Sequence, residues 1–224
     1  ARAAGFAPET MQLEHMPFGT MLGKDGKPFK TRQGGIIKLA DLLDEAERRA
    51  AALVREKNPD IGLEQLNQLA KVIGLGAVKY SDLSKNRTSD YVFDWDQMLS
   101  FDGNTAPYLQ YAYSRIQSVL RKSEVDPTLL PDNAVAEDEP ERRLAVCIAG
   151  FNDVLQQVAD DGYPHYLCAY LYDLATRFTA FYEQCPILVS DDAQRTRRLS
   201  LANSAGITLQ KGLELLGIDV VDHM

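Results

Sequence analysis

The strongest constraint on the fold is the spacing of apolar residues in the second half of the chain. In three successive stretches, at about 140–161, 164–183 and 191–216, apolar side chains return every three or four positions. This period places them along one face of an α-helix. Long amphipathic helices with short links pack together, so we predict a helical bundle. The predicted buried stripes are Leu144, Ile148, Phe151, Leu155 and Val158; Leu167, Leu171, Leu174, Phe178 and Phe181; and Leu199, Ala202, Gly206, Leu209, Leu213 and Leu216.

Capping and turn residues mark the ends of these three helices. Glu139 as a cap, with Pro140 in the first turn, predicts the start of the first helix, and Gly162 predicts its end. Pro186 ends the second helix, and the third begins near Asp191. We therefore expect one uninterrupted first helix, followed by two more.

The first half of the chain also predicts helices. Apolar residues in helical register extend over about 39–58 and 62–79. A further helix over about 104–122 has a capping residue at its start, either Asn104 or Thr105. The chain is therefore expected to be mainly α.

The charged residues are unevenly distributed along the chain. The net charge is −8, so any contact with RNA has to come from local basic patches. Six acidic residues and three prolines fall within 126–141, which predicts a solvated linker. The arginines at 195, 197 and 198 are interpreted as a solvated helix face.

The cysteines and histidines predict no metal site. Cys147, Cys168 and Cys185 are odd in number and widely spaced, which favours buried free thiols. The three histidines are scattered as well. No apolar run reaches the roughly 18 residues needed to cross a bilayer. We expect a cytoplasmic protein without a membrane contact, a DNA partner or a bound prosthetic group.

A glycine-rich basic segment at 19–35 follows an extended or strand-like stretch at 11–22. Glycines let the backbone approach a ligand closely, and several positive charges can stabilise a polyphosphate leaving group. On residue types alone, a solvated basic loop with turn glycines is the simpler interpretation. The basic residues of this loop are Lys24, Lys27, Lys30 and Arg32, with Lys38 just beyond.

Six segments spread along the chain resemble one known family. These segments are residues 13–21, 30–46, 89–96, 100–116, 173–182 and 215–224. They are similar to arginyl-tRNA synthetase, a class I aminoacyl-tRNA synthetase. The family carries its flexible ATP-activating loop, related to the Lys-Met-Ser-Lys-Ser signature, at the position of the glycine-rich segment.

The resemblance implies two domains. Residues 1–95 would be the end of a class I catalytic domain, with a short strand, the ATP loop and helices that contact the tRNA stem. Residues 96–224 would be an all-α anticodon-binding bundle. No His-x-Gly-His element occurs in the chain. The chain therefore looks like a carboxy-terminal portion whose arginine pocket lies mostly elsewhere, and it is expected to form no arginyl-adenylate alone.

The resemblance also assigns roles within the loop. The run from Phe29 to Arg32 stands in place of Met-Ser-Lys-Ser. Catalytic roles are implied for Lys27, Lys30 and Arg32. ATP would be a substrate, with magnesium, and would not be a resident cofactor. The implied ATP-binding residues are Gly26, Lys27, Lys30, Thr31 and Arg32.

A second set of residues is predicted to bind tRNA. Tyr108, Tyr111 and Arg115 are spaced to lie on one side of a helix. Tyrosine rings can stack on unpaired bases, and arginine can hold phosphate. The alternative is that the tyrosines pack at the edge of the bundle with wet hydroxyl groups. The resemblance favours RNA contact, and it adds Gln110 and Met224 to the set.

Two functions are compatible with these patterns. In the first, the chain is part of an arginine–tRNA ligase, which activates arginine with ATP and transfers it to the 3′ end of tRNA(Arg). In the second, it is a non-catalytic helical module, and the basic loop contacts RNA or protein.

Overall fold

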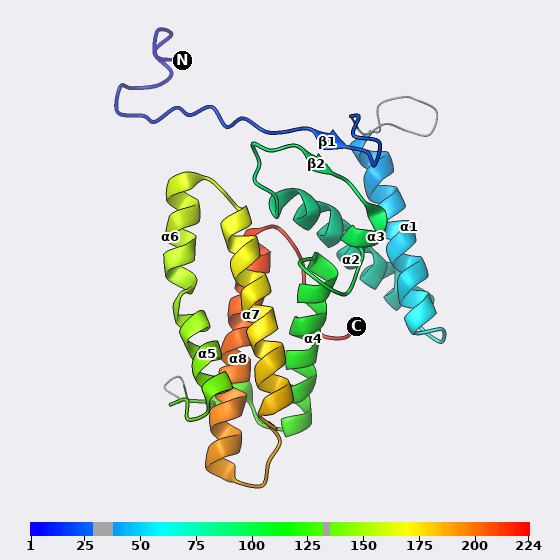
Figure 1. The fold of residues 1–224 in the computed structure, drawn as a ribbon, viewed down its shortest axis with the longest axis vertical. Coiled ribbons are helices and arrows are strands. Elements are labelled where there is room, and N and C mark those ends of the chain that lie inside the picture. The colour runs from blue at the N-terminus through cyan, green and yellow to red at the C-terminus, as the bar shows by residue number, and fades with distance from the viewer. Residues whose placement is uncertain (29–37, 132–134) are drawn as a thin grey trace.

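The computed structural model describes residues 1–28, 38–131 and 135–224. Its larger part is the predicted bundle, in which five helices contact one another (Figure 1). A short 3₁₀ helix, η1 (Pro127–Leu129), lies in the connection between the first two of them. The bundle helices are α4 (Ala106–Ser123), α5 (Glu139–Ala149), α6 (Phe151–Asp161), α7 (His165–Gln184) and α8 (Asp192–Leu215).

The smaller part lies beside the start of α4. It contains a two-stranded parallel sheet, in which Met21 pairs with Tyr91. Of the extended stretch predicted at 11–22, only two residues form a strand. The elements of this part are β1 (Met21–Leu22), α1 (Leu39–Lys57), α2 (Leu63–Leu83), β2 (Tyr91–Val92) and α3 (Trp95–Met98).

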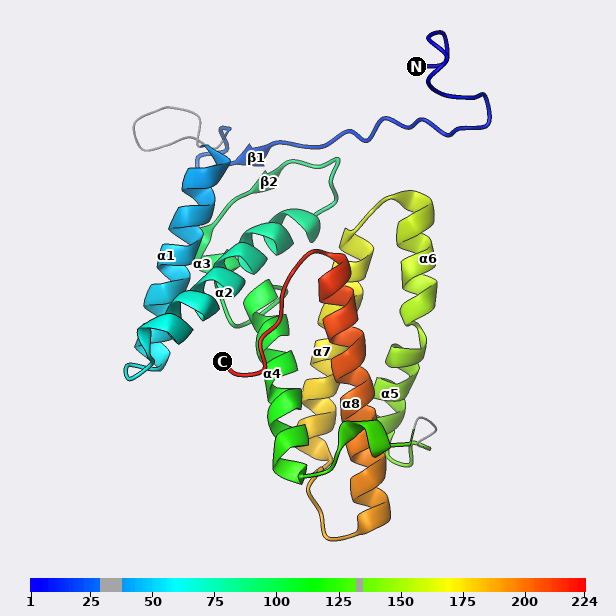
Figure 2. The same cartoon turned by 180° about the vertical axis from the view of Figure 1, so that it is seen from behind.

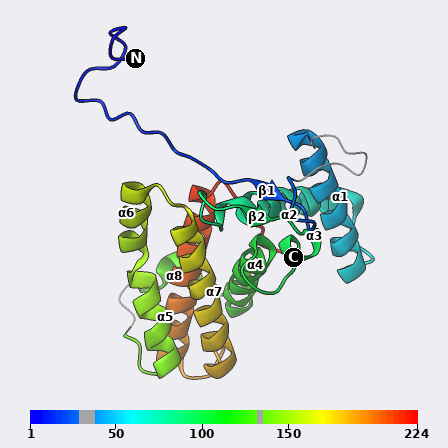
Figure 3. The same ribbon diagram turned by 45° about the horizontal axis from the view of Figure 1, so that its top comes forward.

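The first residues of the chain extend away from the helical body (Figure 3), whereas the Gly19 N–H donates to the carbonyl of Arg87, where the chain contacts the body. Phe6 and Phe18, which precede Gly19, are 84% and 86% exposed. No helix in the described parts of the chain is both long and apolar enough to cross a membrane.

Capping residues position most helix ends as predicted. Thr105 caps α4, where its Oγ1 accepts the N–H of Tyr108 at 3.3 Å. Asp191 caps α8 and accepts the N–H of Gln194 at 2.7 Å. Gly162 ends α6 with a left-handed φ of 66°, a conformation that glycine adopts without steric cost.

The prediction of one uninterrupted helix over about 140–161 is wrong. The chain forms α5 and α6, which are separated at Gly150. Glycine weakens a helix interior because its backbone loses more freedom on folding. The cap of α5 is Asp138, one residue before the predicted Glu139. None of the residues of α6 is fully buried, so its apolar stripe is only half covered.

The end of the acidic segment binds two arginines of the cluster, which corrects the prediction of solvated structure for these residues. Glu141 is fully buried, and it accepts from Arg198 Nε at 2.8 Å and from Arg197 Nε at 3.1 Å. Arg198, only 5% exposed, also pairs with Asp138 at 2.8 Å. Because a buried charge needs a partner, this network fastens the segment to α8.

Two apolar cores meet at α2. One core fills the bundle, and the other lies between α1, α2 and the segment around Phe93. Tyr80 of α2 belongs to the bundle core and is 1% exposed. Its hydroxyl donates to the carbonyl of Cys168 on α7 at 2.9 Å. The two parts are therefore held together by a shared side chain.

The helices α1 and α2 approach each other closely at Gly74. A β-carbon at this position would lie 2.8 Å from the backbone carbon of Ala46. Gly74→Ala is therefore expected to force the helices apart and to lower the free energy of unfolding by about 1–3 kcal/mol. Chemical denaturation measures this change, with Gly62→Ala as the control because Gly62 has open space around it.

Candidate nucleic-acid interface and phosphate loop

The part of the glycine-rich loop that the structure describes, which ends at residue 28, forms a tight turn. The N–H of Gly23 donates to the carbonyl of Lys27 at 2.8 Å, and the N–H of Gly26 donates to that of Gly23 at 2.9 Å. Gly26 has a φ of +72°, which explains why a glycine stands there. The turn places Lys27 at its end, exposed to solvent.

The two described lysines of the turn differ in their surroundings. Lys24 Nζ lies 2.9 Å from Asp94 Oδ2, and Asp94 also caps α3. The hydrogen bond to Asp94 raises the pKa of Lys24 and lowers the pKa of the carboxyl group. Within the described parts of the chain, the side chain of Lys27 has no such partner. Lys27 is therefore available to an anion, whereas Lys24 is already paired.

The other predicted loop residues, Lys30, Thr31 and Arg32, lie outside the described residues. The described chain resumes at Lys38, which is the N-cap of α1.

The predicted face of α4 brings Tyr111 and Arg115 together. The Arg115 guanidinium lies 5.5 Å from the centre of the Tyr111 ring and 4.9 Å from that of Tyr182 on α7. Tyr111 is 44% exposed and also meets the edge of Phe101. Exposed rings next to a guanidinium suit an unstacked base, which needs a π-face and a nearby positive charge.

Tyr108 lies on the same helix but is half-buried, so it is less exposed than Tyr111. Its ring packs against Tyr172 of α7 with 5.6 Å between centroids, and it contacts the bundle core. Of the two predicted tyrosines, Tyr111 is therefore the one with more ring surface open to a ligand.

A groove of about 620 Å³ opens beside Tyr111. Met224 lines it and is 40% exposed. Lys57, at the end of α1, places its Nζ 4.8 Å from the centre of the Phe101 ring at this groove. Sequence reasoning missed Lys57 and Phe101 because only the folded chain brings the end of α1 next to α4. The groove combines apolar walls, aromatic rings and a cation, so it can hold an unpaired base.

Gln110 is not on this surface, although it was predicted to bind tRNA. Its side chain is fully buried, and Nε2 donates to the carbonyl of Val72 at 3.3 Å and to that of Asp219 at 2.9 Å. On a helix, the residue next to an exposed Tyr111 points in another direction. Gln110 therefore contacts backbone from two other segments and has no exposed atoms for a base.

One group of possible metal ligands lies within the described part of the chain. Ligand atoms of Asp138, Glu141 and Cys185 are within 4.8 Å of one another. Both carboxylates are bound by arginine, and burial raises the pKa of the Cys185 thiol. A thiolate and free carboxylate oxygens are what a cation needs, so this group does not fit a metal ion.

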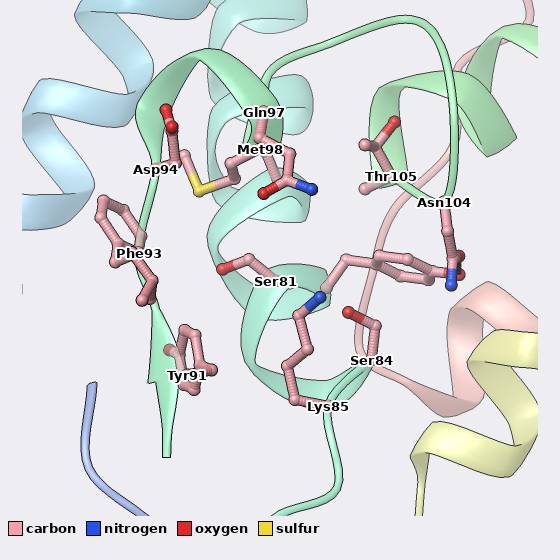
Figure 4. A pocket seen from close by; sticks show the side chains of 14 residues that line it. Ser81, Ser84, Lys85, Tyr91, Phe93, Asp94, Gln97, Met98, Asn104 and Thr105 are labelled. Atoms are coloured by element: carbon pink, nitrogen blue, oxygen red, sulfur yellow. Dashed lines mark hydrogen bonds between the residues drawn. The ribbon is translucent and has the colours of Figure 1, made fainter. Parts of the chain in front are cut away.

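A much smaller pocket lies where α2, β2, α3 and the start of α4 meet (Figure 4). Its volume is about 40 Å³. Asp94 and Lys85 line it, and Asn104 Oδ1 lies 2.5 Å from the Tyr80 hydroxyl oxygen. The pocket is too small for a nucleotide, so it belongs to the junction between the two parts.

Comparisons with known proteins agree with this arrangement. Residues 1–95 match the family described as tRNA synthetases class I (R), catalytic domain. Residues 109–224 match the DALR anticodon binding domain. The chain is 56% identical to an arginine–tRNA ligase of Proteus mirabilis and 58% identical to one of Klebsiella pneumoniae. Both alignments cover the whole chain but only 39% of the relative, so the chain spans about two fifths of their length.

Solved structures show the same fold. An arginyl-tRNA synthetase of Thermus thermophilus superimposes with a TM-score of 0.82 at 34% identity, over 92% of this chain and 35% of that one. An arginyl-tRNA synthetase of Plasmodium falciparum gives a TM-score of 0.79 at 32% identity, over 92% of this chain and 34% of that one. The chain therefore belongs to the arginyl-tRNA synthetase family, of which it represents the carboxy-terminal part.

Proposed function

We propose that the chain is part of an arginine–tRNA ligase and that it supplies the ATP loop and the anticodon-binding surface. The observation that carries this proposal is the placement of both features on α1. In the sequence, the glycine-rich segment comes just before Lys38, the N-cap of this helix, and Lys57 at the other end of the helix lines the aromatic groove. A helix of 19 residues spans about 28 Å, so one rigid element links the two sites.

In the proposed reaction, the arginine carboxylate attacks the α-phosphate of ATP, and pyrophosphate leaves. Negative charge then builds on the leaving oxygens, and Lys27, Lys30 and Arg32 stabilise it. The arginyl group passes to the 3′ end of tRNA(Arg). Magnesium accompanies ATP, because the triphosphate needs a divalent ion to neutralise its charge.

The two proposed domains divide this work. Residues 1–95 contribute the loop and the stem-contacting helices, and residues 96–224 bind the anticodon region through Tyr108, Tyr111, Arg115 and Met224. Most of the arginine pocket lies outside the chain. Translation enzymes of this kind work in the cytoplasm, which is the proposed location.

The exposed ring of Tyr111 provides the test of the proposed RNA surface. Tyr111→Ala is expected to weaken binding of tRNA(Arg) by roughly 1–3 kcal/mol, because one base loses its stacking partner. The thermal midpoint should change little, since the ring is 44% exposed. Fluorescence titration of the chain with tRNA(Arg) measures the affinity, and few neutralised phosphates should make its salt dependence modest.

Two comparisons make this titration decisive. Tyr166→Ala removes another partly exposed ring, away from the groove, and should leave the affinity unchanged. A tRNA with a different anticodon should bind more weakly than tRNA(Arg). Equal affinity for both tRNAs would favour the non-catalytic module, and a loss for Tyr111→Ala that is matched by unfolding would assign the ring to the core.

A further inference from the structure

The carboxy-terminal tail, residues 216–224, turns back after α8 and runs along α4 (Figure 2). Ile218 is 2% exposed and belongs to the bundle core, whereas Val221 packs against the core of α1 and α2. The tail ends at the groove, where His223 and Met224 form part of the lining. The last residues of the chain therefore shape the proposed RNA site.

Gln110 joins this tail to two helices. It lies on α4, and the two protons of its amide are both donated, one to Val72 on α2 and one to Asp219 in the tail. Space for this amide depends on Gly76, because a β-carbon there would lie 2.8 Å from Gln110 Nε2 and 3.2 Å from Ile218. Three segments of the chain thus meet at one fully buried side chain.

Other side chains hold the tail as well: Lys79 on α2 donates to the carbonyl of Gly217, and two side chains of α4 bind the residues beyond Asp219. Ser114 Oγ donates to the carbonyl of Val221 at 2.7 Å. The Arg121 guanidinium donates to the carbonyl of Asp222 at 3.1 Å and lies 3.2 Å from His223 Nδ1. Both donors belong to α4, so Gln110 is the one among these three side chains that also binds α2.

We propose that Gln110 is a positioning residue for RNA recognition, which acts through the tail and touches no nucleotide itself. By holding Asp219 against α2 and α4, it fixes where His223 and Met224 stand opposite Tyr111 and Lys57. This inference rests on the proposed function, since it assigns the groove to a base of the arginine tRNA. Without the two hydrogen bonds of Gln110, the aromatic rings of the groove stay in place, but the tail residues that line the groove are no longer held in a fixed position.

Gln110→Leu tests this role because leucine fills similar space without donating a hydrogen bond. The variant is expected to bind tRNA(Arg) about tenfold more weakly, the change that corresponds to the loss of one or two net hydrogen bonds. Affinity for a tRNA with another anticodon should stay unchanged, so discrimination between the two tRNAs falls. Amide hydrogen exchange in residues 217–224 should become faster, which reports directly on the tail.

Two further variants separate positioning from a general loss of stability. Thr208→Val removes a buried hydroxyl of α8, and it should leave tRNA discrimination and the exchange of the tail intact. A chain that ends at Asp219 should lose discrimination like Gln110→Leu, and combining both changes should add nothing. If Gln110→Leu fails to fold, a shortened chain that keeps full discrimination still overturns the positioning role.

The outcomes distinguish this inference from the function on which it rests. If the unaltered chain does not prefer tRNA(Arg), the proposed function fails. The positioning role is overturned if the unaltered chain and Gln110→Leu prefer tRNA(Arg) equally strongly and amide exchange in residues 217–224 is equally slow in both. The same conclusion follows if the shortened chain keeps full discrimination.

Discussion

Lys27→Ala is expected to slow arginine activation by the intact ligase by about 2–4 kcal/mol of transition-state free energy, roughly 30- to 1000-fold. The structure places this lysine at the end of the turn, exposed and without a partner among the described residues, and its charge is proposed to meet the leaving pyrophosphate. Because the charge acts mainly in the transition state, kcat should fall more than the KM for arginine rises. Arginine-dependent ATP–pyrophosphate exchange measures both.

Lys24→Ala is the matched control from the same turn. Its charge is already paired with Asp94, so its removal should change the exchange rate far less than Lys27→Ala does. An equal and large loss in both variants would show that the turn acts through its shape. Near-normal exchange with Lys27→Ala would move the catalytic charge to Lys30 or Arg32, which are proposed to act beside it.

Glu141→Ala is expected to lower the free energy of unfolding by about 3–5 kcal/mol, because it leaves the buried charge of Arg198 without its main partner. The carboxylate accepts four hydrogen bonds, from Arg197, Arg198 and the N–H groups of residues 137 and 138. Glu139→Ala, which breaks only exposed pairs with Arg142 and Arg143, should cost less than 1 kcal/mol. Urea unfolding monitored by circular dichroism measures both changes.

The same carboxylate predicts a dependence of stability on pH. Burial acts to raise the pKa of Glu141, but the donors around it outweigh burial and lower the pKa from 4.5 to about 2. The folded state therefore binds the proton less tightly than the unfolded chain does, so the contribution is complete above pH 4.5 and is lost as the pH falls toward 2. A shift of this size corresponds to about 3 kcal/mol.

Glu141→Gln provides the check on this pH dependence. Glutamine does not titrate, so the variant should be less stable at pH 7 and should lose less stability between pH 4.5 and 2 than the unaltered chain. Parallel stability curves for the two proteins over this range would contradict the assignment.

Local sequence signals were sufficient for most helices. The apolar period of Leu167, Leu171 and Leu174 places these residues in the core of the bundle, as predicted. Caps such as Thr105 and Asp191 act within three residues of their own position, so they can be recognised without knowledge of the fold. The spacing of four residues between Tyr111 and Arg115 accounts in the same way for the face of α4 that they share.

The errors concern contacts between residues far apart in the sequence. Glu141 and Arg198 are separated by 57 positions, and no local pattern distinguishes them from solvated charges. Gln110 lies between two tyrosines of a recognisable segment, but its partner Asp219 is 109 positions away. The break at Gly150 was missed for a different reason, because an isolated glycine within an amphipathic run is often tolerated.

Because Tyr80 belongs to α2 but packs in the core of the bundle, the two parts of the chain cannot be separated freely and joined to other proteins. The tyrosine ring is enclosed by the bundle, and its hydroxyl satisfies a carbonyl of α7. If the bundle were cut at residue 96 and joined to another protein, it would lose the Tyr80 ring. An apolar cavity would remain in its core, and the Cys168 carbonyl would lose this hydrogen bond. The bundle therefore cannot be exchanged between proteins as an independent domain. In a chimaera, the new partner domain would have to provide a tyrosine at the position of Tyr80.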